Sequence, residues 1–326
     1  MDLSIIIVSW NVKDKLRECL KSIQETVGAL TNTECFWDDT ATQHSVLPLG
    51  VLPLEYEVFV ADNDSKDGSA EMVVKEFPEF FVIPNRENLG FAKANNQGIK
   101  LSQGRYVLLL NPDMRLLPGT LEKMVRFMDD PQNAKVGVAG CHLVSPVVHN
   151  PSQPPLILRG GEDFETVPQV RKFPMLKDQL AIMLKLPHFF PKIVDKYMMP
   201  DFDYSKEARV ESIRGSFFMI RREVLDKIGL LDEGFFIWFE EVDFCKRVTE
   251  AGYTVAYTPI AKCVDYVGQS FKQIKFYPKQ KMFTESMLYY FKKHRPWWEY
   301  EVLDWLRPVV LVMTWAGDLV RSRISR

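Results

Sequence analysis

The stretch LLLNPDMRL, residues 108–116, joins an apolar run to a polar, acidic segment. Its leucines form an apolar run that is typical of a buried strand, and Asn111, Pro112 and Asp113 follow directly. Proline cannot donate a hydrogen bond to a neighbouring strand, so the strand is expected to end there. Ligands of open α/β sheets bind beyond the carboxyl ends of the strands. The stretch therefore predicts an α/β sheet with Asp113 at its ligand-binding edge.

Strands and helices alternate before this stretch. The β-rich run LSIIIVS at 3–9 is apolar throughout, which is typical of a strand covered on both faces. The spacing of apolar residues and of turn residues predicts helices at 12–23, 67–77 and 91–101, and further strands at 57–63, 80–83 and 105–110. This alternation predicts a doubly wound, mostly parallel α/β sheet with helices on both faces.

Two stretches interrupt the pattern. Residues 27–54 have no clear period and predict an insertion, and residues 146–208 are proline-rich and predict a long irregular segment. We expect one domain over residues 1–270, followed at 271–326 by a helical tail that is aromatic and basic.

Composition narrows the possible classes of protein. The chain has 326 residues and a net charge of −2, which gives no argument for nucleic acid as a partner. Residues 271–326 nevertheless hold eleven Lys and Arg against five Asp and Glu, which favours an anionic surface as the partner of the tail. The five scattered cysteines argue against a disulfide framework or a zinc site. The sequence shows neither a signal peptide nor an apolar run long enough to span a bilayer, so we expect a cytoplasmic protein.

Polar side chains follow two of the expected strands. Asp62 ends the strand at 57–63, and Asn111 and Asp113 follow the strand at 105–110. Each could be an ordinary turn residue, since Asp and Asn are common in turns. Because the carboxyl ends of parallel strands meet at one edge of the sheet, two such groups together favour a ligand site.

The nucleotide-binding motifs of other α/β families are missing. No glycine follows the first strand, which argues against a dinucleotide fold, and the P-loop pattern is absent as well. Asn88 and Gly90 precede the helix at 91–101, and a helix N-terminus can hold a phosphate or a ribose. The alternative is an ordinary helix cap.

The stretch FFIWFEEVDFCKR at 235–247 offers candidates for a general base. Glu240, Glu241 and Asp243 open a predicted helix, where acidic residues commonly compensate the helix dipole. A carboxylate beside Trp238 and Phe239 would also be partly desolvated, which raises its pKa and suits a general base.

Several motifs in a fixed order carry a resemblance. The chain contains SIIIVSWNVKDKLRECLKSI, VADNDSKDGS, NLGFAKANNQGI, YVLLLNPD, RGSFFMIRRE, LDEGFFIWFEEVDFCKRVTEAGY and GQS. In this order they resemble the family-two, GT-A-fold glycosyltransferases, specifically the rhamnosyltransferase-like branch, although Leu231 stands where that family usually has Phe. The resemblance covers residues 3–25, 56–140 and 210–272, about three fifths of the chain.

The resemblance implies a GT-A fold and a nucleotide-diphosphate sugar as donor, linked to dTDP or UDP. Asp62 would meet the base, and Ser9 and Trp10 would lie beside the nucleotide. Asn111 holds the first position of the family's Asp-x-Asp motif, and Asp113 would face a divalent cation, Mg²⁺ or Mn²⁺. The ribose and diphosphate would be lined by Asn88, Gly90, Phe91 and Asn95.

The resemblance also implies roles for the acidic residues nearer the C-terminus. Glu241 would be the general base, followed in order of preference by Glu240 and Asp243. The family usually has VHHGGQS where this chain has VDYVGQS, so Asp265 stands near the position of a metal-binding histidine. Asp265 either replaces that histidine as an oxygen ligand or makes an ion pair.

These expectations describe an inverting, metal-dependent glycosyltransferase that acts on a lipid-linked saccharide or a cell-surface glycan precursor, with residues 146–208 on the acceptor side. The alternative from another class is a non-catalytic sugar-nucleotide or membrane-binding module with a decayed metal site. A sugar nucleotidyltransferase would require a glycine-rich, basic loop after the first strand, and this chain has no such loop.

The tail carries four tryptophans and terminal arginines. This composition predicts an interfacial helix at an anionic membrane, which would place the protein at the inner face of the cell membrane. The alternative is a helix that packs on the domain or on a second copy in a homodimer.

Overall fold

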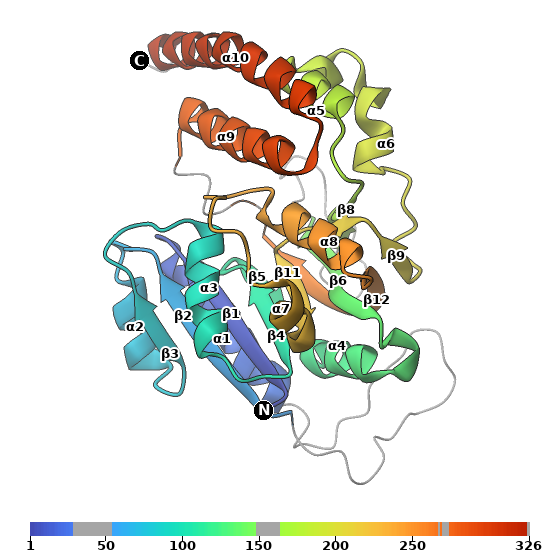
Figure 1. Cartoon of the computed structure of the whole chain (residues 1–326). Helices are drawn as coiled ribbons and strands as arrows, with labels where there is room; N and C mark the ends of the chain where they lie inside the picture. Colours follow the sequence, from blue (N-terminus) through green and yellow to red (C-terminus); the bar gives the residue numbers. More distant parts are fainter. Residues whose placement is uncertain (29–53, 148–163, 267, 269–273, 325–326) are drawn as a thin grey trace, which may run out of the picture.

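The leucine run lies at the centre of a ten-stranded mixed sheet (Figure 1). The computed structural model describes residues 1–28, 54–147, 164–266, 268 and 274–324. In spatial order the main strands are β3 (Phe81–Pro84), β2 (Tyr56–Asp62), β1 (Leu3–Ser9), β4 (Tyr106–Leu110), β11 (Phe217–Arg221), β6 (Val136–Pro146), β12 (Thr254–Asp265) and β5 (Met114–Leu116). Two short strands, β7 (Phe164–Thr166) and β9 (Ala208–Val210), pair with β6 and β12.

The first half of the sheet is parallel and doubly wound, as predicted. β1 pairs in parallel with β2 and β4, and β2 pairs in parallel with β3. The chain runs outward from β1 to β3 and then returns to β4 on the other side of β1. This reversal creates a topological switch point at the carboxyl ends of β1 and β4. Beyond it, β11 is antiparallel to both of its neighbours, so the complete sheet is mixed.

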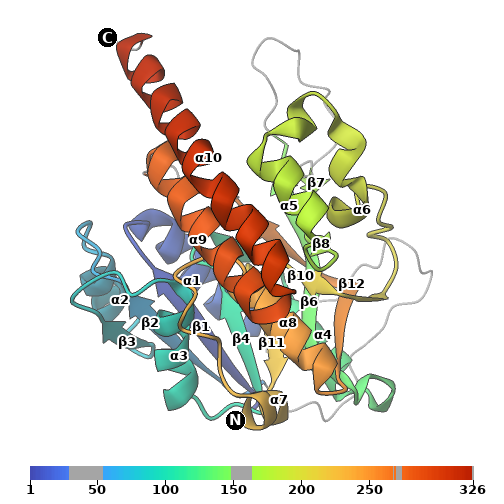
Figure 2. The ribbon, with the colours of Figure 1, turned by 45° about the horizontal axis from the view of Figure 1, so that its top comes forward.

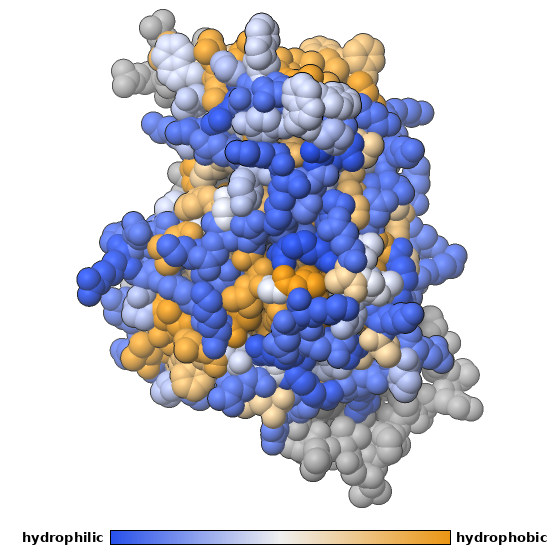
Figure 3. Space-filling model, in the orientation of Figure 1, coloured by the Kyte–Doolittle hydropathy of each residue, from blue (hydrophilic) through white to orange (hydrophobic). Residues whose placement is uncertain are grey.

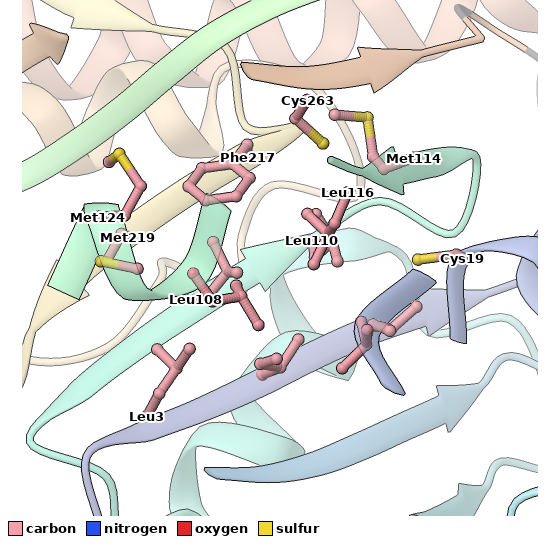
Figure 4. Close-up of a cluster of buried hydrophobic side chains, with 14 of the residues drawn as sticks. Leu3, Cys19, Leu108, Leu110, Met114, Leu116, Met124, Phe217, Met219 and Cys263 are labelled. Atoms are coloured by element: carbon pink, nitrogen blue, oxygen red, sulfur yellow. The ribbon is translucent and has the colours of Figure 1, made fainter. Parts of the chain in front are cut away.

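Helices cover both faces of the sheet, which explains why its central strands are apolar throughout. Ile5, Ile7 and Leu108 face one buried cluster, whereas Ile6 and Leu109 face the other. Figure 4 shows part of the first cluster, in which Leu108 and Leu110 lie near Phe217. The helices that flank the sheet are α1 (Lys13–Gly28), α2 (Ser69–Glu76), α3 (Phe91–Leu101), α4 (Thr120–Asp129), α7 (Arg222–Ile228) and α8 (Glu240–Glu250).

The C-terminal part forms two long helices above the carboxyl edge of the sheet (Figures 1 and 2). α9 (Phe276–His294) lies against α10 (Trp297–Ile324), which also contacts α5 (Leu176–Met183). A third buried cluster joins Phe239, Val242, Phe291 and Leu303, so it links the start of α8 to both helices of the tail. The predicted C-terminal helices are therefore confirmed, and they pack against the start of α8.

The two predicted interruptions lie only partly within the described residues. Most of 27–54 and all of 148–163 fall outside them. The described part of 146–208 is less irregular than predicted, because it forms α5, α6 (Asp195–Met198), β7, β9 and the short strand β8 (Val170–Arg171). β8 pairs with β10 (Ser212–Ile213) in a separate two-stranded sheet. Within the described part of the chain, no helix is long and apolar enough to cross a membrane.

Candidate active site

A cavity of about 470 Å³ opens at the topological switch point, between the carboxyl edge of the sheet and α9. Pro112 and the adjoining residues bring the end of β4 into its wall, while Met282 contributes from α9. Nine of the predicted site residues line this one cavity: Trp10, Asn88, Gly90, Phe91, Asn111, Asp113, Glu240, Glu241 and Asp265.

Four predicted residues lie outside the cavity lining: Ser9, Asp62, Asn95 and Asp243. Ser9, Asp62 and Asn95 are buried beside it. Asp62 accepts a hydrogen bond from the backbone of Ser65 through one carboxylate oxygen, at 3.0 Å. Its other oxygen, the Ser9 hydroxyl and the Asn95 carbonyl oxygen are buried and have no hydrogen-bond partner in the described structure. Buried polar atoms are normally paired, so these three atoms are exceptions within the described structure.

The turn before α3 is held by amide side chains. The Asn63 side chain donates to the Gly90 carbonyl at 3.1 Å and to the Asn88 side chain at 3.2 Å. The Asn88 side chain in turn accepts a hydrogen bond from the Gly90 backbone at 2.9 Å. Gly90 has a φ of +80°, and a Cβ atom there would lie 2.4 Å from the Phe236 carbonyl oxygen. Only glycine fits this turn, which brings the N-terminus of α3 against the loop before α8.

The loop before α8 is strained. Trp238 and Phe239 both have positive φ values, 64° and 68°, which bulky L-residues adopt only when the surroundings enforce it. Two hydrogen bonds hold the loop: Phe91 donates its backbone N–H to Phe236 at 2.7 Å, and the Ser286 hydroxyl of α9 donates to Ile237 at 2.7 Å. This strained turn places the acidic start of α8 at the cavity wall.

Glu240 and Glu241 are the first two residues of α8, and each has one buried carboxylate oxygen without a hydrogen-bond partner in the described structure. Burial raises the pKa of Glu240, and the neighbouring charge of Glu241 raises it further. Burial also raises the pKa of Glu241, although the positive charges of Arg171 and Arg214 oppose this effect. The two arginines therefore favour the ionised form of Glu241.

Asp243 points away from the cavity and joins α8 to α9. Its carboxylate accepts hydrogen bonds from Arg247 at 2.8 Å and lies 2.7 Å from Lys293 and 2.6 Å from a His294 ring nitrogen. Burial alone would raise the pKa of Asp243, but its hydrogen bonds to His294 and Lys293 and the charge of Arg247 outweigh burial and lower this pKa to about 2. These contacts describe a fixed anion in a structural network.

Asp113 and Asp265 bring two carboxylates to neighbouring strands at the cavity. β12 pairs with β5 so that Asp265 stands opposite Met114, and the Tyr266 backbone donates to the Asp113 carbonyl at 3.2 Å. Both aspartates are buried. The Tyr266 hydroxyl donates to Glu18 of α1, which fixes the end of β12 above Asp113.

The two aspartates could supply some, but not all, of the ligands of a divalent cation. Carboxylate oxygens are the ligands that Mg²⁺ and Mn²⁺ prefer, and the oxygens of a diphosphate commonly supply further ligands. No group of three or more His, Cys, Asp or Glu side chains within the described residues could hold a metal ion by itself. Arg214 also lies 3.6 Å from the Asp265 carboxylate, so the ion-pair alternative for Asp265 is present in this structure.

Comparison with known proteins identifies the family. The model of the family "Glycosyl transferase family 2" matches residues 4–229, well over half of the chain. This chain belongs to glycosyl transferase family 2. The match includes β1, β4 and the Asp113 turn, and it ends just before the strained loop.

Among its relatives, this family 2 glycosyltransferase is similar to rhamnosyltransferases. It is 24% identical over 254 residues to the N-acetylglucosaminyl-diphospho-decaprenol L-rhamnosyltransferase of Mycobacterium tuberculosis, a match that covers 74% of this chain and 76% of the relative. It is 22% identical over 184 residues to the rhamnosyltransferase WbbL of Escherichia coli, covering 54% and 61% of the two chains.

A solved structure confirms the predicted GT-A fold. The mannosyltransferase PcManGT from Pyrobaculum calidifontis, solved in complex with GDP-Man and Mn²⁺, matches with a TM-score of 0.52 and 17% sequence identity. The match covers 99% of this chain and 75% of the other. At this identity the likeness concerns the fold alone.

Sequence reasoning missed several residues of the cavity. Arg214 and Ser216 lie in the quoted motif RGSFFMIRRE, and Phe236 and Trp238 lie in FFIWF, yet of these four residues only Trp238 was expected, beside the base. Their position inside recognised motifs was the available signal. The sequence gives no signal for Met282, because its place in the cavity wall depends on how α9 packs over the sheet.

Proposed function

We propose that this family 2 glycosyltransferase moves a sugar from a nucleotide-diphosphate donor to a hydroxyl group of a lipid-linked saccharide or another cell-surface glycan, with inversion at the anomeric carbon. The observation that carries this proposal is the convergence of Asp113, Asp265 and Glu241 on one cavity at the switch point. The cavity wall therefore combines two aspartates that could hold a cation for the diphosphate with a glutamate that could accept the proton of the acceptor hydroxyl.

Glu241 is the proposed general base. Its carboxylate accepts the proton of the acceptor hydroxyl, the freed oxygen bonds to the anomeric carbon, and the bond from that carbon to the diphosphate breaks. A single displacement from the face opposite the leaving group inverts the configuration. The strained turn at Trp238 and Phe239 holds the base in place before the substrate arrives.

The departing diphosphate needs positive charge. Asp113 and Asp265 would hold Mg²⁺ or Mn²⁺, which when bound would neutralise the charge that develops on the leaving group. The N-terminus of α3, with the Gly90 backbone N–H directed into the Asn88 turn, would lie beside the ribose and the diphosphate. Ser9, Asp62 and Asn95 supply the buried, unpaired oxygens on the nucleotide side.

The relatives suggest which substrates to test first. Two of them are called rhamnosyltransferases, and one of these names a diphospho-decaprenol acceptor. We therefore propose an activated deoxyhexose of the rhamnose class, linked to dTDP or UDP, as donor, and a polyprenyl-diphosphate-linked sugar as acceptor.

A binding and turnover experiment tests the proposal. The protein is screened by thermal shift and calorimetry against dTDP- and UDP-linked sugars with Mn²⁺, Mg²⁺ or EDTA. Donors that bind are then incubated with a polyprenyl-diphosphate-linked sugar, and the anomeric configuration of the product is read by NMR. We expect metal-dependent binding of at least one donor and an inverted product. Binding without transfer to any glycan acceptor would favour the non-catalytic alternative.

We also propose that the tail contacts an anionic membrane. α10 buries Leu303 and Val310 against the rest of the protein, but its opposite side is apolar and exposed, with Trp305 at 87% exposure. Figure 3 shows apolar residues gathered along the upper end of the molecule, over α10. Such a surface, close above the cavity, suits an enzyme whose acceptor is anchored in lipid.

A further inference from the structure

Among the described residues, the cavity lining has one positively charged side chain. Four acidic side chains line it: Asp113, Asp265, Glu240 and Glu241. Among the described residues of the lining, Arg214 is the only Lys, Arg or His. A donor diphosphate is itself an anion, so its entry beside several carboxylates is unfavourable unless positive charge is already present.

Arg214 is held at this place by the backbone around it. Its N–H donates to the Gln169 carbonyl at 3.0 Å, and two residues further on the Ser216 carbonyl accepts a hydrogen bond from the Asn111 backbone at 3.0 Å. The loop that carries Arg214 is therefore fixed directly beside the turn that carries Asp113. The arginine side chain is 30% exposed, while the Asp265 carboxylate at 3.6 Å is 2% exposed.

The position of Arg214 relates it to both halves of the site. Its guanidinium pairs with Asp265, whose strand neighbours the Asp113 turn. The following residue, Gly215, lies against Glu241, since a Cβ atom on Gly215 would come 3.6 Å from the Glu241 Cβ. A guanidinium in this setting can release Asp265 and donate two parallel hydrogen bonds to phosphate oxygens, a geometry that arginine matches better than lysine.

We propose that Arg214 is a donor-binding residue that exchanges partners: it pairs with Asp265 in the empty site and with the diphosphate when a nucleotide donor enters. Asp265 is then available to a divalent cation, so Arg214 and the cation neutralise the diphosphate together. The inference rests on the proposed function, because it takes a nucleotide diphosphate as the ligand.

The exchange predicts opposite effects on two ligands. In Arg214→Gln, UDP and dTDP lose a charge-assisted contact, and we expect about 10- to 100-fold weaker binding in EDTA. The same variant removes a cation that lies beside Asp265, so Mn²⁺ alone should bind several-fold more tightly than it does to the wild type. A merely structural role for Arg214 would weaken both.

Calorimetry with UDP or dTDP in EDTA, and with Mn²⁺ in the absence of nucleotide, measures the two affinities. Arg214→Lys should recover part of the nucleotide affinity, because it keeps the charge but loses the fork of donors. Arg209→Gln is the matched control, since Arg209 pairs with Glu207 on the surface, and both of its affinities should be unchanged. Thermal unfolding confirms that each variant is folded.

Two results would overturn the inference. If Arg214→Gln binds UDP and dTDP as tightly as the wild type in EDTA, Arg214 makes no contact with the diphosphate. If its affinity for Mn²⁺ falls as well, the arginine supports the site only structurally. A wild type that binds neither nucleotide, with or without metal, contradicts the proposed function itself and the inference with it, so the two failures are distinguishable.

Discussion

Two glutamates that are neighbours in sequence differ in their electrostatic surroundings. Glu240 is buried beside the charge of Glu241, and both effects favour its neutral form. Glu241 is half-buried, and although burial raises its pKa, two arginines stabilise its charge. A general base must be ionised at the working pH and still hold a proton well, and Glu241 meets both conditions better than Glu240. Asp243, fixed by Arg247, Lys293 and His294, has a pKa of about 2 and is a poor proton acceptor.

The first prediction concerns the base. Glu241→Gln should bind the donor normally and lose about 10²- to 10⁴-fold in turnover, the usual contribution of a general base. Because burial raises the pKa of Glu241, the wild-type rate should fall on acidification at a pH above the ordinary glutamate pKa of about 4.3. Steady-state kinetics across pH measures both effects.

Two variants make this prediction specific. Glu250→Gln, which alters an exposed ion pair on the same helix, should leave turnover unchanged. If Glu240→Gln shows the large loss and Glu241→Gln does not, the base has been assigned to the wrong member of the pair.

The second prediction concerns the metal. Asp113→Asn keeps the shape of a buried side chain but removes its charge, so it should stay folded, lose most turnover and lose most of the metal-dependent part of nucleotide affinity. Calorimetry with UDP or dTDP, with and without Mn²⁺, measures that part. Asp226→Asn, on the exposed side of α7, is the control. Unchanged Mn²⁺-dependent binding in Asp113→Asn would contradict a metal role for this carboxylate.

At the scale of elements, the joint between α8 and α9 couples the acidic start of α8 to the tail. Asp243 is completely buried, and it contacts Arg247 on its own helix and Lys293 and His294 on α9. The Ser286 hydroxyl adds a second connection, because it holds the strained loop before α8. Movement of α9 would therefore disturb the position of the proposed base.

The third prediction tests this joint. Asp243→Asn leaves buried cations without their counter-charge and should lower the free energy of unfolding by roughly 3 kcal/mol at neutral pH. Because the folded-state pKa of about 2 lies below the ordinary value, the stabilising effect of Asp243 is complete above about pH 4 and is lost as the pH falls toward 2. The difference between wild type and variant should shrink over this window in urea unfolding experiments.

An exposed ion pair between α9 and α10 provides the control for the joint. Glu285→Gln removes an exposed ion pair between α9 and α10 and should change the free energy of unfolding by less than about 1 kcal/mol. An equally small effect of Asp243→Asn would mean that apolar packing alone holds α9 on α8.

Elements with strong local signals were predictable from sequence. The strand at 3–9 and the helix at 91–101 agree with β1 and α3 to the residue, because a continuous apolar run and a glycine before a periodic segment mark their ends. The antiparallel insertion of β11 between β4 and β6 left no such signal, since pairing direction depends on connections far along the chain. The pairing of Arg214 with Asp265 was hidden for the same reason: the two residues meet only in the folded sheet.

At the scale of the whole molecule, apolar side chains are exposed at the end that lies above the cavity. An exposed stripe along α10 repeats with helical spacing and consists of Trp298, Val302, Trp305, Val309, Val312 and Leu319. The segment after α5 adds Phe189, at 77% exposure, and Phe190, with the exposed cations Lys185 and Lys192 nearby in sequence. Because α10 contacts α5, the two parts belong to one end of the molecule (Figure 2).

The last prediction is that this end binds anionic bilayers. Burial of the exposed rings among lipid headgroups would remove apolar surface from water, and the basic residues of the tail would be attracted to the anionic surface, each by up to about 1 kcal/mol. Vesicles that contain phosphatidylglycerol should sediment with the protein at low salt, whereas pure phosphatidylcholine vesicles should bind it less.

Deletion of 297–326 would also remove the buried Leu303 and Val310, so surface substitutions are the sharper test. Trp305→Ser combined with Val312→Ser should abolish vesicle binding and leave donor affinity intact. Val74→Ser combined with Phe81→Ser, which changes exposed apolar residues remote from α10 on α2 and β3, should bind vesicles like the wild type. If the wild-type protein ignores anionic vesicles at low salt, the stripe instead covers a second copy or another protein, and a soluble acceptor becomes the better proposal.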